Sequence, residues 1–186
     1  MYNHIAVDFG NVNDEGIFSQ IKEVMEWQIA NKVKVVTVGL PTAEDEKIIE
    51  FLKYYVSRKF LQENKVKVSF IGKWYDLPGN VVDEIKTLIE ATKDNFDYFF
   101  NFVINYDGRE EIVDACSLIC RKLLSAKISI SDVSEKEIKE NLYTSNFECP
   151  DIIIKIGDDK LNGFLLWDSS KSKMIFAKRF DMKLLN

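Results

Sequence analysis

The sequence predicts an α/β fold, in which a parallel β-sheet of about six strands is covered by helices on both faces. The first observation is a fourfold alternation between short runs of apolar or β-branched residues and longer segments with apolar residues at helical spacing. The second is the stretch from Tyr98 to Asp114. Its residues up to Ile104 are almost all apolar or aromatic, as in a strand buried on both faces. Asn105 to Gly108 then form a polar turn, and apolar residues return at helical spacing from Arg109.

The first four strands are expected where β-branched and apolar residues cluster, and a helix is expected after each. The strands are His4–Phe9, Val33–Val38, Val66–Ile71 and Tyr98–Ile104. The helices cover about Asp14–Ala30, Ala43–Glu63, Pro78–Thr92 and Arg109–Leu124. Thr42 can cap the second helix, and Pro78 suits the first turn of the third. The predicted buried face of the first helix is Ile17, Ile21, Val24, Met25 and Gln28, and that of the fourth is Ile112, Val113, Cys116 and Ile119.

The pattern loosens in the last third of the chain. Ser125–Ile130 is compatible with an edge strand or an extended loop, and Asp132–Asn141 with a short helix. Asp151–Ile156 reads as a fifth strand. Phe164–Trp167, together with Met174–Phe176, is expected to close the sheet.

Length and composition predict one globular domain over residues 1–186, with 46% hydrophobic and 30% charged residues. A net charge of −5 argues against broad nucleic-acid binding. Three cysteines and one histidine, without a CxxC motif, argue against a disulfide framework or a zinc site; Cys116 and Cys120 are expected to be buried thiols. Because no signal peptide and no run of eighteen apolar residues occurs, we expect a cytoplasmic chain.

Polar residues follow several predicted strands, and in a parallel sheet these junctions meet at one edge. Gly10-Asn11 precedes a helix, where backbone N–H groups can face an anion. Asn105, Lys155, Lys160 and Asn162 add amides and ammonium groups at the same edge. One interpretation is a phosphate or diphosphate pocket. The other, which spacing alone favours, is routine turn chemistry beside a solvated run of charges.

Four segments resemble motifs of one enzyme family, in the family's order. His4–Asn11 resembles H-x-A-x-x-M-D-G-N, and Phe70–Pro78 resembles F-I-G-x-x-x-x-L-P. Asn101–Asp114 resembles N-x-x-x-N-Y-G-G-R-x-E-I-V-x-A, the most specific of the four. The fourth segment, made of Asn141–Ser145, Cys149–Lys155 and Asn162–Asp168, resembles L-Y-T-x…D-P-D-L-x-I-R…S-N-F-L-L-W-Q. The family is that of the cis-prenyltransferases, the undecaprenyl and dehydrodolichyl diphosphate synthases.

The resemblance covers nearly the whole chain and implies parallel strands flanked by helices, an apolar tunnel for a growing polyprenyl chain, and dimerisation around Phe164–Trp167. It implies condensation of isopentenyl diphosphate onto an allylic diphosphate, assisted by Mg²⁺. Such chemistry asks for a carboxylate to hold the metal and for guanidinium groups to bind the diphosphates.

The sequence departs from the family at residues that would carry this chemistry. Matching Gly10-Asn11 to D-G-N places Phe9 where the catalytic aspartate belongs. Asp8 is one residue away, and a shift of one residue along a strand turns a side chain to the opposite face unless a bulge compensates.

The phosphate-binding positions differ as well. Val12-Asn13-Asp14 replace G-R-W, Gly39–Ala43 replace a serine-threonine-glutamate-asparagine loop, Lys155 and Lys160 replace two arginines, Asn162 replaces a serine, and Lys173 replaces a metal-linked glutamate. The sequence ends at Asn186, so the family's carboxyl-terminal segment with its R-x-G tail is expected to be missing.

The first hypothesis is therefore a catalytically degenerate cis-prenyltransferase subunit that pairs with an active homologue, as a hetero- or homodimer. The alternative is an active enzyme with a rearranged site, in which Asp8 holds Mg²⁺ and Lys155 and Lys160 replace the arginines. A third interpretation is a protein that binds an isoprenoid or phosphorylated ligand without chemistry. In each case the expected ligand-binding residues are Gly10, Asn11, Asn105, Arg109, Lys155, Lys160 and Asn162. Isoprenoid diphosphates are the expected ligands, and contact with a membrane would be peripheral.

Overall fold

The structure, a computed structural model, describes residues 2–10, 16–41, 43–57 and 59–185. Its centre is a six-stranded parallel sheet with the strand order β3-β4-β2-β1-β5-β6. The strands are β1 (His4–Asp8), β2 (Val35–Gly39), β3 (Val66–Ile71), β4 (Tyr98–Val103), β5 (Ile152–Ile156) and β6 (Lys173–Ala177). The predicted fold class is confirmed, since every pair of neighbouring strands runs parallel.

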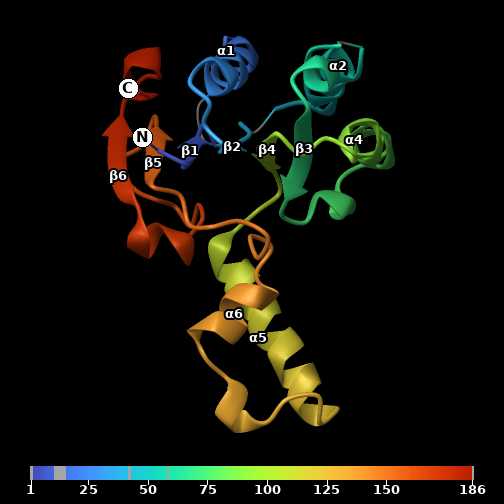
Figure 1. Ribbon diagram of the computed structural model, residues 1–186, viewed down its shortest axis with the longest axis vertical. Helices are drawn as coiled ribbons and strands as arrows, with labels where there is room; N and C mark the ends of the chain where they lie inside the picture. The colour runs from blue at the N-terminus through green and yellow to red at the C-terminus, as the bar shows by residue number, and fades with distance from the viewer. Residues whose placement is uncertain (1, 11–15, 42, 58, 186) are drawn as a thin grey trace.

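Helices lie on both sides of the sheet (Figure 1). They are α1 (Ile17–Ala30), α2 (Asp45–Val56), α3 (Phe60–Glu63), α4 (Gly79–Thr92), α5 (Gly108–Leu124) and α6 (Glu135–Asn141), with short 3₁₀ turns η1 (Trp74–Asp76), η2 (Ile130–Asp132), η3 (Asp168–Lys171) and η4 (Met182–Leu185). Helices α1, α2 and α4 lie on one side. Helices α5 and α6 lie on the other and extend away from the sheet as an arm, which we call the α5–α6 arm, residues 108–141 (Figure 1).

The two faces of the sheet differ in polarity because side chains alternate along each strand. On β1, Ile5 and Val7 belong to the large apolar core shared with α1, α2 and α4. His4, Ala6 and Asp8 point to the opposite face. That face carries a smaller apolar cluster formed by Ala6, Ile71, Val103, Ile153, Phe164 and Leu165. It also carries the buried polar residues His4, Thr37, Asn101, Asp8 and Lys155.

The predicted buried face of α1 is the observed one, because all five of its residues are buried. The prediction for α5 is wrong in part. Ile119 is buried and Ile112 half-buried, but Val113 is 63% exposed, Cys116 and Cys120 are exposed thiols, and the other buried residues of the helix are Gly108, Glu111 and Ala115. The reason is that the arm extends beyond the sheet, so much of the α5 surface is not covered by the described parts of the chain (Figure 1).

Two further expectations need correction, and one alternative that the sequence left open is decided. The single helix predicted over residues 43–63 is divided into α2 and α3; the Ser57 hydroxyl donates to the Tyr54 carbonyl, a local bond that competes with helix continuation. Residues 125–129 form no strand, which leaves the loop alternative. Residues 164–167 form turns, because the left-handed φ values of Gly163 (83°) and Leu165 (45°) are incompatible with a strand, and β6 alone closes the sheet.

No helix in the described part of the chain is both long enough and apolar enough to cross a bilayer. The proposed cap Thr42 and the helix start at Asp14 lie outside the described residues.

Candidate functional site

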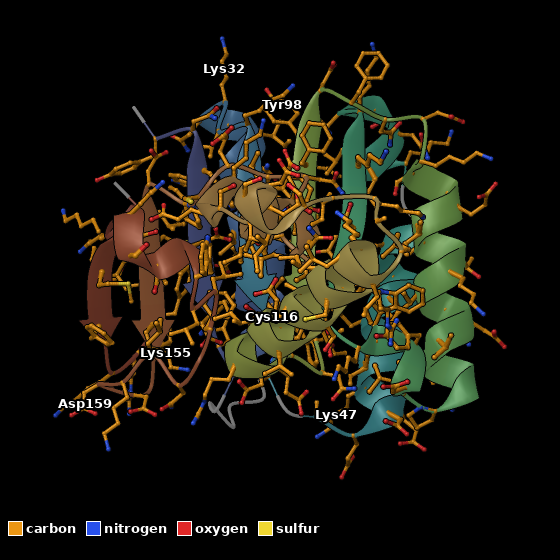
Figure 2. All side chains as sticks on the ribbon, turned by 90° about the horizontal axis from the view of Figure 1, so that it is seen from below. Lys32, Lys47, Tyr98, Cys116, Lys155 and Asp159 are labelled. Atoms are coloured by element: carbon orange, nitrogen blue, oxygen red, sulfur yellow. The ribbon has the colours of Figure 1, made fainter. Side chains whose placement is uncertain are left out.

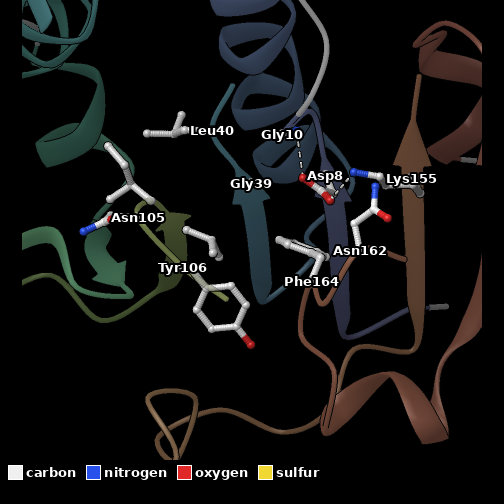
Figure 3. A pocket seen from close by; sticks show the side chains of 11 residues that line it. Asp8, Gly10, Gly39, Leu40, Asn105, Tyr106, Lys155, Asn162 and Phe164 are labelled. Atoms are coloured by element: carbon white, nitrogen blue, oxygen red, sulfur yellow. Dashed lines mark hydrogen bonds and ion pairs between the residues drawn. The ribbon is translucent and has the colours of Figure 1, made fainter. Parts of the chain in front are cut away.

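A cavity of about 310 Å³ opens at the carboxyl edge of the four central strands, where open α/β sheets bind ligands. Figure 2 shows the two edges of the sheet, with Lys32 and Tyr98 at the amino ends of the strands and Lys155 and Asp159 at the carboxyl ends. The cavity is lined by Asp8, Gly10, Gly39, Leu40, Val103, Ile104, Asn105, Tyr106, Lys155, Asn162 and Phe164 (Figure 3). Strands β1, β2, β4 and β5 each supply part of this lining, so distant parts of the sequence build one site.

Asp8 faces this cavity. Side chains alternate between the two faces of a strand. Ile5, Val7 and Phe9 all point into the large apolar core, so Asp8, which lies between Val7 and Phe9, points to the other face and lines the cavity. The expectation that a one-residue offset would turn Asp8 away from the site is therefore wrong. The carboxylate is fixed locally, since its Oδ1 accepts a hydrogen bond from the backbone N–H of Gly10 at 2.8 Å.

Lys155 is the partner of Asp8. The register between β1 and β5 places the two residues opposite each other on the same face. The Lys155 Nζ donates to Asp8 Oδ2 at 2.7 Å, and the two side chains are 2% and 7% exposed. Two buried charges of opposite sign compensate each other's loss of hydration, whereas either one alone would be left unpaired.

Glycines give the Asp8 carboxylate its space. A Cβ on Gly39 would lie 2.4 Å from Asp8 Oδ1 and 3.0 Å from the Phe164 ring, and a Cβ on Gly10 would lie 2.9 Å from the same oxygen. Gly39 was not among the predicted site residues. The signal that could have found it is a glycine that ends a β-branched run directly before Leu40.

Asn105 and Asn162 are two further lining residues that the sequence had indicated. Both have left-handed backbone conformations, with φ values of 47° and 51°. The Asn105 amide donates to the Lys73 carbonyl at 2.9 Å, and the Asn162 amide donates to the Asp158 carboxylate. These bonds hold the two loops, so each amide has a structural partner in addition to its place at the cavity.

Other predicted residues are not part of this cavity. Arg109 is exposed and lies near Asp107, with Nε 3.8 Å from Oδ1. Lys160 is exposed on the loop after β5. Lys173 begins β6 at the opposite edge of the sheet. Asn11, and the substituted positions 12 to 14, lie outside the described residues.

A buried acid fixes one wall of the cavity. Tyr106 donates from its hydroxyl to Glu111 Oε2 at 2.6 Å, and the Thr144 backbone N–H donates to Glu111 Oε1 at 3.3 Å. Burial is the largest influence on Glu111 and raises the pKa of its carboxyl group. Through these bonds the start of α5 is joined to the segment after α6.

A series of hydrogen bonds connects buried polar side chains on the same face of the sheet as Asp8. The His4 Nδ1 lies 2.7 Å from the Glu148 carbonyl oxygen, which can only accept, so Nδ1 carries the proton. Nε2 of the neutral ring then accepts from the Thr37 hydroxyl at 2.8 Å, and Thr37 in turn accepts from the Asn101 amide at 3.1 Å. Burial lowers the pKa of His4, in agreement with a neutral ring.

The described residues do not fit a resident metal ion. Mg²⁺ in proteins is usually bound by one or two carboxylates and substrate phosphates. Asp8 is the one acidic residue among those that line the cavity, and its charge is already paired with the buried Lys155 ammonium group, so the lining has no unpaired negative charge for a cation. No group of three histidine, cysteine or acidic side chains suited to a metal occurs in residues 2–10, 16–41, 43–57 and 59–185.

Comparison with solved structures supports the fold. Lavandulyl diphosphate synthase from Lavandula x intermedia, solved with dimethylallyl diphosphate, superposes with a TM-score of 0.72 and 19% identity over 99% of this chain and 92% of that one. A probable undecaprenyl diphosphate synthase from Campylobacter jejuni gives a TM-score of 0.74 and 22% identity over 96% and 87%. At these identities the likeness concerns the architecture alone.

Comparison with sequences identifies the family. A tritrans,polycis-undecaprenyl-diphosphate synthase of Thermoplasma volcanium is 31% identical over 172 residues, which are 86% of this chain and 67% of the relative. An isoprenyl transferase of Streptococcus mutans is 36% identical over 146 residues, 74% of this chain and 58% of the relative. The chain thus spans roughly three fifths to two thirds of the length of these relatives. The family model described as putative undecaprenyl diphosphate synthase matches residues 13–180, and the chain therefore belongs to this family of cis-prenyltransferases.

Proposed function

We propose that the protein is a cis-prenyltransferase with a rearranged site, which condenses isopentenyl diphosphate onto an allylic diphosphate at the cavity of Asp8 and Lys155. The observation that carries the proposal is the position of Asp8. Its carboxylate faces the cavity at the carboxyl edge of the sheet, although the neighbouring Phe9 occupies the matching place in the family motif.

The cavity lining suits the two halves of a prenyl diphosphate. Lys155 provides a buried ammonium group for the diphosphate, with the amide of Asn162 beside it (Figure 3). Leu40, Val103 and Phe164 provide apolar surface for the hydrocarbon. In the proposed reaction a carbon–carbon bond forms between the two prenyl units, the allylic carbon–oxygen bond breaks, and the diphosphate leaves with the electron pair. A C–H bond of the isopentenyl unit then gives its electrons to the new double bond, and its proton passes to the released diphosphate or to water. The chain's own part is to bind and orient both substrates and to keep water from the allylic carbon.

Activity of the purified chain tests this proposal. The chain is incubated with farnesyl or geranylgeranyl diphosphate and labelled isopentenyl diphosphate, and the lipid products are separated. We expect product from the wild-type protein and a loss of at least about a hundredfold in kcat/KM for Asp8→Asn, as for removal of a charged group in a reacting site. Asp94→Asn, an exposed acid outside the cavity, is the matched control. Product formation that is equal in Asp8→Asn and wild type would sink the assignment of Asp8.

The second candidate is a subunit without chemistry of its own that supports an active homologue. The observation that favours it is the ion pair itself, because an Asp8 carboxylate held by Lys155 is not free to act. The same assay separates the two: a supporting subunit makes no product alone but raises the yield of an intact homologue when the two are mixed.

Dimerisation remains a proposal, and the expected contact around Phe164–Trp167 needs revision. Phe164 and Leu165 are 5% and 1% exposed because they fill the smaller apolar cluster of their own chain. A better supported contact is the α5–α6 arm. Its exposed apolar side chains are Val113, Leu118, Leu124, Ile130 and Val133, at 63%, 41%, 89%, 83% and 40%. We propose that a homologous subunit, either a second copy or a relative, covers this surface.

A further inference from the structure

We infer that Lys155 takes the place of a divalent cation beside Asp8, so that the cavity binds a diphosphate without Mg²⁺. The inference rests on the proposed function in that it takes the ligand to be a diphosphate. It goes further by assigning the positive charge that binds this ligand to Lys155. It differs from the Mg²⁺ dependence that the resemblance to the family implies.

The first argument is the occupancy of the carboxylate. Asp8 Oδ2 accepts from Lys155 Nζ at 2.7 Å, and Oδ1 accepts from the Gly10 backbone N–H at 2.8 Å. Each oxygen keeps a second lone pair, but a metal ion that approached it would meet a carboxylate whose negative charge is already paired with the Lys155 ammonium group. The metal ion would have to bind beside this ammonium group or separate it from Asp8.

The second argument is that Lys155 has no other acid to go to in the cavity. The strand register holds its Cα opposite that of Asp8, and the side chain is 2% exposed. Asp8 and Lys155 are the only charged side chains among the residues that line the cavity. The ammonium group would therefore remain close to the incoming metal ion, and two positive charges at short range repel each other.

The third argument is the donor capacity of the ammonium group. Lysine has three N–H donors, and among the described residues Lys155 gives one of them to Asp8. The remaining donors can reach the oxygens of an anion that enters from the open side of the cavity. The ion pair thus repels a cation and accepts an anion, the opposite preference from a bare carboxylate.

The first experiment is calorimetric titration of the full chain with farnesyl diphosphate and, separately, with inorganic diphosphate. Each titration is run once with EDTA and once with MgCl₂ in excess. We expect binding in both buffers, with dissociation constants that differ by less than about threefold. Lys155→Met should weaken binding in EDTA by at least about tenfold and should make binding depend on Mg²⁺, because Asp8 is then free. Lys127→Met, an exposed lysine at the far end of the arm, is the matched control and should behave as wild type.

The outcomes separate the inference from the proposed function. Diphosphate binding that occurs only with Mg²⁺ would overturn the inference and leave the proposed function standing. Absence of diphosphate binding in both buffers would overturn both. Because Lys155→Met leaves a buried charge unpaired, the double variant Asp8→Asn/Lys155→Met keeps the test valid if the single variant does not fold. In the double variant, unchanged binding in EDTA would overturn the inference, and weakened binding that Mg²⁺ fails to restore would support it.

Discussion

At the scale of single residues, the site depends on close contacts between Asp8 and its neighbours. The carboxylate has a backbone donor on one oxygen and an ammonium group on the other, and the absent side chain of Gly39 leaves room for both. A glycine matters here because of the close approach of another group. The same residue type is free of this constraint at Gly79, where an added Cβ would meet nothing within 4 Å.

Gly39→Ala should therefore damage both stability and the site. The added methyl group overlaps the Asp8 carboxylate and the Phe164 ring, and overpacking of this kind costs about 1–3 kcal/mol. Urea denaturation would give the loss of stability, and titration with a diphosphate would give the loss of binding. Gly79→Ala at the start of α4 is the control, for which we expect no loss of stability. Equal midpoints for the two variants would contradict the crowding argument.

His4 should make stability fall in mild acid. Burial holds its pKa in the folded chain below the ordinary value of 6.5, so the contribution of the neutral ring is present above about 6.5 and is lost as pH falls through the folded pKa. In urea denaturation from pH 7.5 down to about 5, the wild-type protein should lose stability more steeply than His4→Gln, which has no group that titrates there. Parallel curves for the two proteins would show that the Glu148–His4–Thr37 chain does not control this loss.

At the scale of elements, α5 serves the cavity with its first turn and leaves the rest of its surface outside. Asp107 caps the helix by accepting from the Arg109 N–H at 2.7 Å, and Gly108 lies against the Gly163 carbonyl. Glu111, one turn later, is the buried acid that joins the helix to Tyr106 and Thr144. The first turn thus positions a wall of the site.

The joint at Glu111 should weaken as the pH rises. Its pKa in the folded chain is raised, so the contribution of the protonated acid is fully present below the ordinary value of 4.5 and is lost as pH rises through the folded pKa. Glu111→Gln keeps an acceptor and a donor without the charge. In urea denaturation we expect Glu111→Gln to gain stability relative to wild type as the pH rises above 4.5, until the folded pKa of Glu111 has been passed. A difference that does not change with pH would exclude titration of this acid as the cause.

The elements also show what sequence patterns can and cannot predict. The central strands β1, β2 and β5 were predictable because all of their residues are buried, and the α1 face because its apolar residues all belong to the large core. The α5 face was not, because apolar spacing does not distinguish a surface covered by the chain's own sheet from one left open. Asp8 was a predicted site residue, but the motif comparison expected its side chain to point away from the cavity. A motif comparison aligns Phe9 with the family's aspartate, but it does not give the direction of a side chain. That direction follows from the alternation along β1: Ile5, Val7 and Phe9 point into the large core, so Asp8 points to the other face.

At the scale of the whole molecule, the chain consists of a layered α/β body and an arm with an apolar surface (Figure 1). The body contains the cavity and most of the core. The arm places five apolar side chains in solvent, an arrangement that favours association with another chain.

Charges on the arm should change the oligomeric state. Leu124→Glu and Ile130→Glu place carboxylates on the most exposed apolar positions, where burial at an interface would be costly. We expect the wild-type protein to be larger than one chain by light scattering coupled to gel filtration, and the double variant to have the mass of one chain. Phe96→Glu is the control, since Phe96 is 64% exposed but lies before β4, away from the arm. A wild-type mass of one chain, both alone and mixed with a homologue, would contradict the proposed contact.

The pairing of Asp8 with Lys155 also has a consequence for the order of folding. The two residues are 147 positions apart, so their contact closes almost the longest loop that the chain can form. β1 and β2 are close in sequence and can pair early. β5 can pair with β1 only when the long segment between them, which contains β3, β4 and the arm, brings them together. We therefore expect the ion pair to form late in folding. A change in its strength should then alter the rate of unfolding more than the rate of folding.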